Sequence, residues 1–368
     1  MVTSGYLGLG IFYFPRQAVA DAGRGGLYSL WVAGLAAFGL MALVFKMNRL
    51  IPNETLSGYA SSLLSKPVGF LVGTYTIIYH LALAISASVL FSFVLGNIFL
   101  PSTPIWAIDG ILVIVAAYMA YGGAAVLART LQASYVPTFV LSVISIIYAF
   151  TMVRHPILFI PTPIIQILPI LHGAYQQGLI FIGFEVSVTL YPFIRQEQRR
   201  RAERYSYFGL AIVLVVLTLN YETILATFGP QLVGTLRWPI VSMFRIISVS
   251  AFFIDKLGSL IIMLWTIVIV AFLAVRFWCL SHDLAIYVHY TAQRGYQYGI
   301  WVGGLLTWIG AISLPNSKIA DIVNQTWIIP LGLGYLLGIP LLVLAVGTLR
   351  KKWVDRFRAS SDLSAGEG

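Results

Sequence analysis

Charged side chains are scarce in this sequence, and this scarcity excludes most classes of protein. Only 10% of the 368 residues are Asp, Glu, Lys or Arg, and 59% are apolar. An ordinary soluble domain is about 25% charged and about 45–50% apolar. The composition therefore excludes a soluble globular domain, and it is too apolar for a disordered chain. A single cysteine, Cys279, excludes an internal disulfide.

Long apolar runs take the place of the missing charge. A helix that crosses the bilayer core needs roughly 20 apolar residues. The sequence predicts an all-α integral membrane protein with ten transmembrane helices. The predicted spans are 1–18, 27–51, 67–100, 104–122, 133–153, 169–193, 206–228, 258–287, 297–314 and 327–349.

The basic residues predict how the helices are oriented. When each Lys and Arg is assigned to the nearer end of its span, 16 fall on the even-numbered connections and the C-terminus, and 7 fall on the odd-numbered connections. Arg276 is counted among the 16. Cytoplasmic loops carry the excess of basic residues. Both termini are therefore expected in the cytoplasm, and the chain in the cell membrane.

We expect a single membrane domain over 1–350, built from two halves of about 1–155 and 165–350. Four prolines between 154 and 177 mark the division between the halves. The remaining segment, 351–368, is too short to bury a core and is expected to form a flexible cytoplasmic tail. Because few residues precede the first glycines, we also expect that the natural chain begins upstream of Met1.

Two glycine-interrupted helices stand at the start of the two halves. The first carries Gly5, Gly8 and Gly10, and the sixth carries Gly178 and Gly183. Glycine lets the backbone leave a helix, and paired interruptions of this kind indicate a transporter binding site near the midplane. The alternative is that these glycines only allow close helix packing.

Interrupted helices expose main-chain groups that can bind a zwitterion. Free N–H groups at a helix N-terminus attract a carboxylate, and free carbonyls can hold an ammonium group. An amino acid satisfies both at once. The first and sixth helices are therefore expected to bind a small nutrient without a metal or cofactor.

The segments LGLGIFYFPRQA, GLIFIGFEVSVTLYPFI and RWPIVSMFRIISVSAFFIDKLGSLIIMLW resemble the B subunit of spore nutrient-germinant receptors, a spore germination permease-like family of the amino acid–polyamine–organocation superfamily. The resemblance covers essentially the whole chain. It implies a five-plus-five inverted repeat, the leucine-transporter-like fold, with helices one and six broken. It also implies nutrient sensing in the inner spore membrane together with A and C receptor subunits.

Helices one and six supply the candidate binding residues. By position, the resemblance matches Gly8 and Gly10 to the broken part of helix one, and the segment from Phe181 to Glu185 to that of helix six. Ser4 can donate to a carboxylate or bond back to its own helix. The predicted substrate-binding set is Ser4, Gly5, Gly8, Gly10, Phe181, Gly183, Phe184 and Glu185.

Several of these side chains have a second interpretation. Glu185 is either a proton-sensitive switch or a structural cap on the loosened backbone, because an ionisable residue in a membrane needs a partner or a cavity. Phe181 and Phe184 either close over the ligand or belong to the core. His80 is expected to be a packing residue rather than a relay.

Three functions compete at this stage. The first is a sensor whose ligand shifts the helix arrangement, and the second is an amino acid permease that uses the same pocket. Helix five carries no charged residue over 133–153, which favours the sensor. No nucleophile, phosphate-loop or metal motif indicates an enzyme.

The five arginines within 195–204 are expected to attract anionic lipid or dock a partner subunit, rather than bind nucleic acid.

Overall fold

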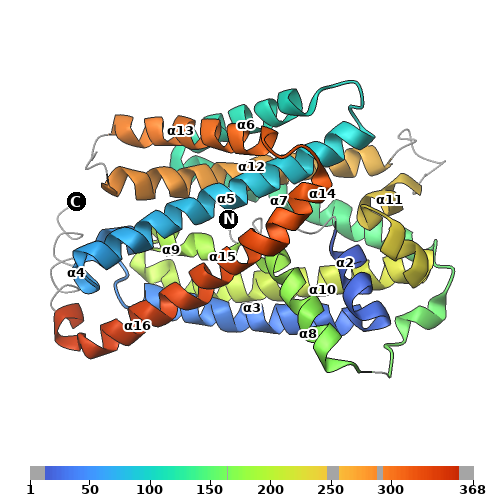
Figure 1. The fold of residues 1–368 in the computed structure, drawn as a ribbon, viewed down its shortest axis with the longest axis horizontal. Coiled ribbons are helices and arrows are strands. Elements are labelled where there is room, and N and C mark those ends of the chain that lie inside the picture. The colour runs from blue at the N-terminus through green and yellow to red at the C-terminus, as the bar shows by residue number, and fades with distance from the viewer. Residues whose placement is uncertain (1–12, 164, 247–256, 288–292, 356–368) are drawn as a thin grey trace.

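The computed structural model describes residues 13–163, 165–246, 257–287 and 293–355. Over these residues the chain is helical (Figure 1). Six helical segments are long and apolar enough to cross a membrane: Phe14–Asn48, Lys66–Ile98, Gly123–Phe150, Gln196–Thr235, Ile262–Tyr287 and Ser317–Leu349. A shorter apolar helix covers Ile105–Tyr121. The protein is thus an all-α membrane protein, whereas the count of ten spans and the inverted repeat stay predictions.

The helices follow the predicted apolar runs. The longer ones are α2 (Phe14–Ala22), α3 (Gly26–Asn48), α5 (Lys66–Ile98), α6 (Ile105–Tyr121), α7 (Gly123–Phe150), α8 (Ile167–Gln176), α10 (Gln196–Thr235), α12 (Leu257–Tyr287) and α13 (Gln293–Ile312). The last helical stretch begins ten residues before the predicted span 327–349. It consists of α14 (Ser317–Val323), π-helical η6 (Asn324–Ile328), α15 (Ile329–Leu333), π-helical η7 (Gly334–Gly338) and α16 (Ile339–Leu349).

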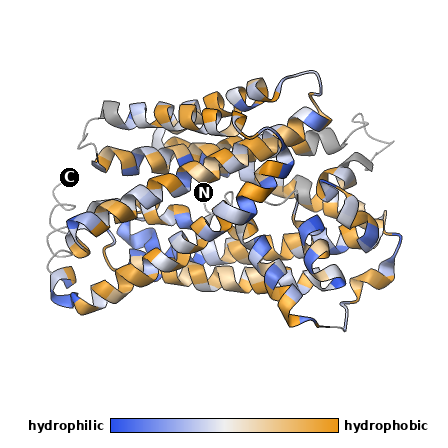
Figure 2. Cartoon of the chain, viewed as in Figure 1, coloured by the Kyte–Doolittle hydropathy of each residue, from blue (hydrophilic) through white to orange (hydrophobic). Residues whose placement is uncertain are grey.

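The surface of the bundle is apolar, as a lipid environment requires. Hydrophobic residues cover the long helices over most of their length (Figure 2). On α6 large side chains such as Ile111 and Tyr118 are 63% and 75% exposed. Soluble monomers rarely expose large contiguous apolar patches, whereas α6, α7 and α13 each expose several large apolar side chains. The exposed faces of these helices therefore contact lipid.

The helices divide into two packed groups. One group, called here the α5 group, consists of α5, α6, α12 and α13, which contact one another. The other, the α3 group, consists of α2, α3, α8 and α10. The C-terminal helices α14–α16 run diagonally across both (Figure 1), with α14 against α5 and α16 against α3.

Side-chain contacts place segments distant in sequence at the same end of the bundle. Arg199 donates to Asn53 Oδ1 at 2.7 Å, and Arg350 donates to the Leu63 carbonyl at 2.9 Å. At the other end, Arg24 donates to the Ile160 carbonyl at 3.0 Å. The first end therefore gathers connections that the sequence predicts to be cytoplasmic, and the second end gathers those predicted to be external.

Two short helices lie between the predicted spans. Helix α4 (Leu56–Leu63) begins after Thr55, whose hydroxyl accepts from the Gly58 N–H. Helix α11 (Pro239–Ile246) lies between the predicted spans 206–228 and 258–287. Helix α10 kinks at Gly229, where φ is 75° and Pro230 follows. The kink coincides with the predicted end of the span at 228, because a non-helical glycine and a proline together interrupt the hydrogen-bond ladder.

Candidate functional site

Helix six is broken in the structure. Helix α8 passes into the 3-10 turn η3 (Gln177–Phe181), and Ile182 is extended, with φ −76° and ψ 130°. After Gly183 the chain resumes as η4 (Phe184–Val186), α9 (Ser187–Leu190) and η5 (Tyr191–Phe193). The interruption thus lies at Ile182–Gly183. We call residues 184–193 the inner segment of helix six.

Glu185 caps this break and carries a buried charge. Its Oε2 accepts from the Gly183 main-chain N–H at 2.6 Å. Its Oε1 forms an ion pair with Arg276 of α12. Both side chains are almost completely buried, at 0% and 1% exposure. The capping interaction agrees with the structural interpretation of Glu185, and the pair with Arg276 adds a charged partner from the α5 group.

Arg276 is buried inside the bundle, although it was counted with the basic connection that follows its predicted span, 258–287. It lies in α12, one turn after Phe272, whose ring centroid is 4.5 Å from the guanidinium carbon. A buried charge is tolerated only when it is paired, and Glu185 provides that pair. Since the partner lies on another helix, the run of residues around Arg276 alone gave no signal of it.

His80 and Tyr79 of α5 extend the polar cluster. His80 Nδ1 lies 3.4 Å from Arg276 Nη1, so the buried His80 has a polar partner on α12. The Tyr79 ring stacks on Tyr335 of η7 with centroids 4.1 Å apart. Helices α5 and α12, the break in helix six and η7 therefore converge here. We refer to Tyr79, His80, Glu185 and Arg276 as the Arg276 cluster.

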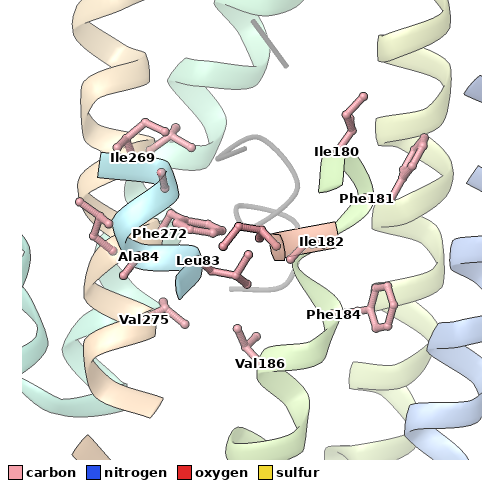
Figure 3. Packing of buried hydrophobic residues seen from close by; sticks show 14 of the residues in the cluster. Leu83, Ala84, Ile180, Phe181, Ile182, Phe184, Val186, Ile269, Phe272 and Val275 are labelled. Carbon is pink, nitrogen blue, oxygen red and sulfur yellow. The ribbon is translucent and has the colours of Figure 1, made fainter. Parts of the chain in front are cut away.

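Phe181 and Phe184 lie on a different side of helix six. Figure 3 shows both rings pointing away from Phe272, whereas Ile182 lies on the side of Leu83 and Phe272. Both phenylalanines are buried, at 2% and 1% exposure. Arg276, the partner of Glu185, lies over the Phe272 ring, so the two phenylalanines point away from the side on which this ion pair contacts Phe272.

The two phenylalanines line an apolar cavity of ≈250 Å³ beside the break. Its walls come from α3, helix six and the α15–η7 region. The lining includes Ala37, Phe181, Ile182, Phe184, Gly332 and Leu336. Helix six therefore presents a polar cluster on one side and an apolar cavity on the other.

Polar bonds attach the inner segment of helix six to its neighbours. Asn48 of α3 donates to the Ser187 carbonyl and hydroxyl, each at 3.2 Å. Tyr191 donates to Glu203 of α10 at 2.8 Å. Both bonds hold the inner segment against the α3 group.

A further bond links the inner segment to α4. Thr189 donates to Asp283 Oδ2 at 3.2 Å, and Asp283 Oδ1 accepts from Ser57 of α4 at 2.8 Å. Asp283 lies on α12, as Arg276 does. The bonds of Glu185 and Thr189 therefore tie the inner segment to the α5 group.

The helix-one half of the predicted site is not described. Ser4, Gly5, Gly8 and Gly10 lie outside the described residues, so their roles stay predictions. Among the residues that the structure does describe, there is no group of three or more His, Cys, Asp or Glu side chains placed to hold a metal ion.

These features define a helical membrane protein with a permease-like interrupted helix, and comparison with known proteins specifies the family. The family model described as "Spore germination protein" matches residues 1–289. The chain therefore belongs to the spore germination protein family of permease-like membrane proteins.

Relatives of known sequence agree with this assignment. Spore germination protein B2 of Bacillus subtilis (strain 168) is 23% identical over 278 residues, which is 72% of each chain. Spore germination protein GerQB of Bacillus cereus is 23% identical over 281 residues, or 76% of this chain and 75% of that protein.

Solved structures show a similar fold in a transporter. A histidine-to-alanine mutant of the Eremococcus coleocola manganese transporter superposes with a TM-score of 0.57 at 14% sequence identity, covering 92% of this chain and 77% of that one. A glutamate-to-alanine mutant of the same transporter gives 0.54 at 16% identity, covering 93% and 76%. At such low identity the likeness concerns the fold alone.

Proposed function

We propose that this protein is a germinant-sensing subunit that binds a small nutrient, an amino acid, at the break in helix six. The observation that carries this proposal is the interruption at Ile182–Gly183 with the buried Glu185–Arg276 pair beside it. Unpaired main-chain groups in a membrane are tolerated only next to a cavity or within protein. A charged pair in the same place adds a polar environment that apolar packing alone does not require.

The geometry around the break suits an amino acid with an apolar side chain. The cavity beside Phe181 and Phe184 is lined almost entirely by apolar groups. Each buried methylene contributes about 0.8 kcal/mol to transfer from water. We therefore expect affinity to rise with side-chain size until the ≈250 Å³ cavity is filled.

Binding at this position would act on the contact between the two helix groups. The inner segment of helix six is bonded to Arg276 and Asp283 of the α5 group and to Asn48 of the α3 group. A ligand that favours one arrangement of these bonds shifts the populations of the two arrangements. Ser57 of α4 shares Asp283 with Thr189, so a shift of the inner segment reaches the bundle end that carries α4.

We further propose that the protein lies in the inner membrane of the spore, with this end facing the cytoplasm. A and C receptor subunits then receive the signal. The excess of basic residues in these connections supports the orientation. Binding and rearrangement, rather than enzymatic chemistry, then constitute the function. The resemblance to receptor B subunits supports the choice of partners.

A binding screen tests this function. Purified protein in detergent would be titrated with each amino acid. A ligand that binds the native state raises the free energy of unfolding, so a stability assay would detect binding as this increase. Saturable binding of at least one amino acid is expected, and it should be weakened in Gly183→Val. If no amino acid binds, the proposed function is wrong. Rapid saturable uptake of the amino acid into liposomes without partner subunits would show that the protein is a permease rather than a sensor.

A further inference from the structure

The Arg276 cluster contains hydrogen-bonding groups that nothing in the described fold uses. Arg276 Nε and the Tyr79 hydroxyl are buried without a partner among the described residues, and so is His80 Nε2. Tyr79 and His80 are both 0% exposed, and Arg276 is 1% exposed. Buried polar groups are almost always hydrogen-bonded, so three orphaned groups in one cluster need an explanation.

Most of the unpartnered polar groups in the cluster are donors. A guanidinium can only donate, so His80 Nδ1 accepts from Arg276 and the proton of the neutral ring is on Nε2. Glu185 Oε2 accepts from the Gly183 N–H, and Oε1 lies in the ion pair with Arg276. A partner that satisfies the remaining donors therefore brings acceptor atoms.

From this arrangement we infer that the Arg276 cluster binds the carboxylate of the nutrient, with Arg276, His80 and Tyr79 as the donors. A carboxylate offers two oxygens with about four acceptor positions, which suits three donors. Glu185 already balances the charge of Arg276. The favoured ligand is therefore a net-neutral zwitterion rather than a simple anion. This inference rests on the proposed function. It assigns the binding of the carboxylate to these side chains, whereas the sequence predicted main-chain N–H groups for that role.

The Arg276 cluster and the apolar cavity lie on opposite sides of Ile182 and approach each other there. A Cβ built on Gly332 would lie 3.8 Å from Tyr79 Cε2 and 3.9 Å from Ile182 Cδ1. Gly332 and Ile182 also line the cavity, so the Tyr79 ring approaches the cavity wall where these two residues meet. A small amino acid can place its carboxylate in the cluster and its side chain in the cavity when Ile182 moves aside.

The test compares apolar amino acids with their methyl esters, which lack the carboxylate charge. Wild-type protein would be titrated with L-valine and L-leucine and with the two esters at about pH 6, where the amino group stays protonated. We expect the acids to bind roughly ten- to hundredfold more tightly, because hydrogen bonds to a charged group are the stronger ones. Equal affinities for acid and ester would overturn the inference and leave the proposed function intact.

Tyr79→Phe assigns the effect to the cluster. This variant removes a hydroxyl that bonds nothing in the described fold, so its stability should equal or exceed that of wild type. We expect it to weaken acid binding roughly two- to tenfold and to leave ester binding unchanged. The matched control is Tyr287→Phe, which removes a hydroxyl that donates to the Gly69 carbonyl at 3.1 Å, near the far end of α12.

The control should lower stability without changing the preference for acid over ester. Retention of the full preference in Tyr79→Phe and in Arg276→Lys would overturn the inference in favour of main-chain binding. If neither the two acids nor any other amino acid binds the wild-type protein, the proposed function itself fails. That outcome is distinct from equal binding of acid and ester.

Discussion

Replacement of Glu185 by glutamine isolates the charge of the buried ion pair. Glutamine keeps an oxygen that can accept from the Gly183 N–H, whose bond to Glu185 is 2.6 Å. It removes the negative charge opposite Arg276, which is 1% exposed and has no second acidic partner among the described residues. Breaking a buried pair from one side typically costs about 3–5 kcal/mol, because the remaining charge stays buried.

This loss is large beside a total folding stability of about 5–15 kcal/mol. Glu185→Gln is therefore expected to lower the free energy of unfolding by roughly 3 kcal/mol or more. The double variant Glu185→Gln with Arg276→Gln should lose less than either single variant, since it leaves no unpaired charge. Glu197→Gln, at the exposed start of α10, is the matched control and should change stability by less than about 0.5 kcal/mol.

The measurement is a denaturation cycle on the purified protein in detergent, with wild type, both single variants and the double variant. The four unfolding free energies give the coupling between the two side chains. We expect a coupling of at least about 2 kcal/mol. Single variants within about 0.5 kcal/mol of wild type, or fully additive effects, would refute the ion pair as a buried link between the two helix groups.

Three further substitutions test the other parts of the site. Gly183→Val adds a β-branched side chain at the break and should abolish the response to ligand while membrane insertion, measured by fractionation, stays largely intact; wild-type affinity in this variant would contradict a binding site at the break. Phe184→Ala removes a ring that is 1% exposed, so thermal unfolding should show a loss of about 3–5 kcal/mol, and a neutral result would mean that the cavity wall collapses freely. Asp283→Asn weakens the bonds from Ser57 and Thr189 to neutral ones, at a cost of about 1–2 kcal/mol in the same assay, and an unchanged midpoint would show that Asp283 holds neither α4 nor helix six.

The sequence predicted the helices well because membrane spans depend on local composition. The uncharged stretch after Lys66 became α5, and the glycine and proline at 229–230 mark the kink of α10. The break in helix six was predicted in the same way, and it falls at Gly183. Each of these features depends only on a residue and its neighbours along the chain, so the sequence alone is sufficient to predict it.

The composition of the site was harder to predict because its members lie far apart in the chain. Arg276 was counted with the basic connection after its predicted span, since the residue that pairs with it inside α12 is Glu185 on helix six. His80 and Tyr79 carry no motif, and only the packing of α5 against α12 brings them to the cluster. The Phe184 ring points away from Phe272, whereas Glu185 pairs with Arg276, which lies over the Phe272 ring; residue type alone does not specify these directions.

A density map of the protein saturated with an amino acid that it binds would show whether the ligand lies at the break in helix six. We expect ligand density beside Gly183, with a carboxylate within hydrogen-bond distance of Arg276. Ligand density elsewhere in the bundle, with residues 182–184 lying against their neighbours as in the present structure, would contradict it.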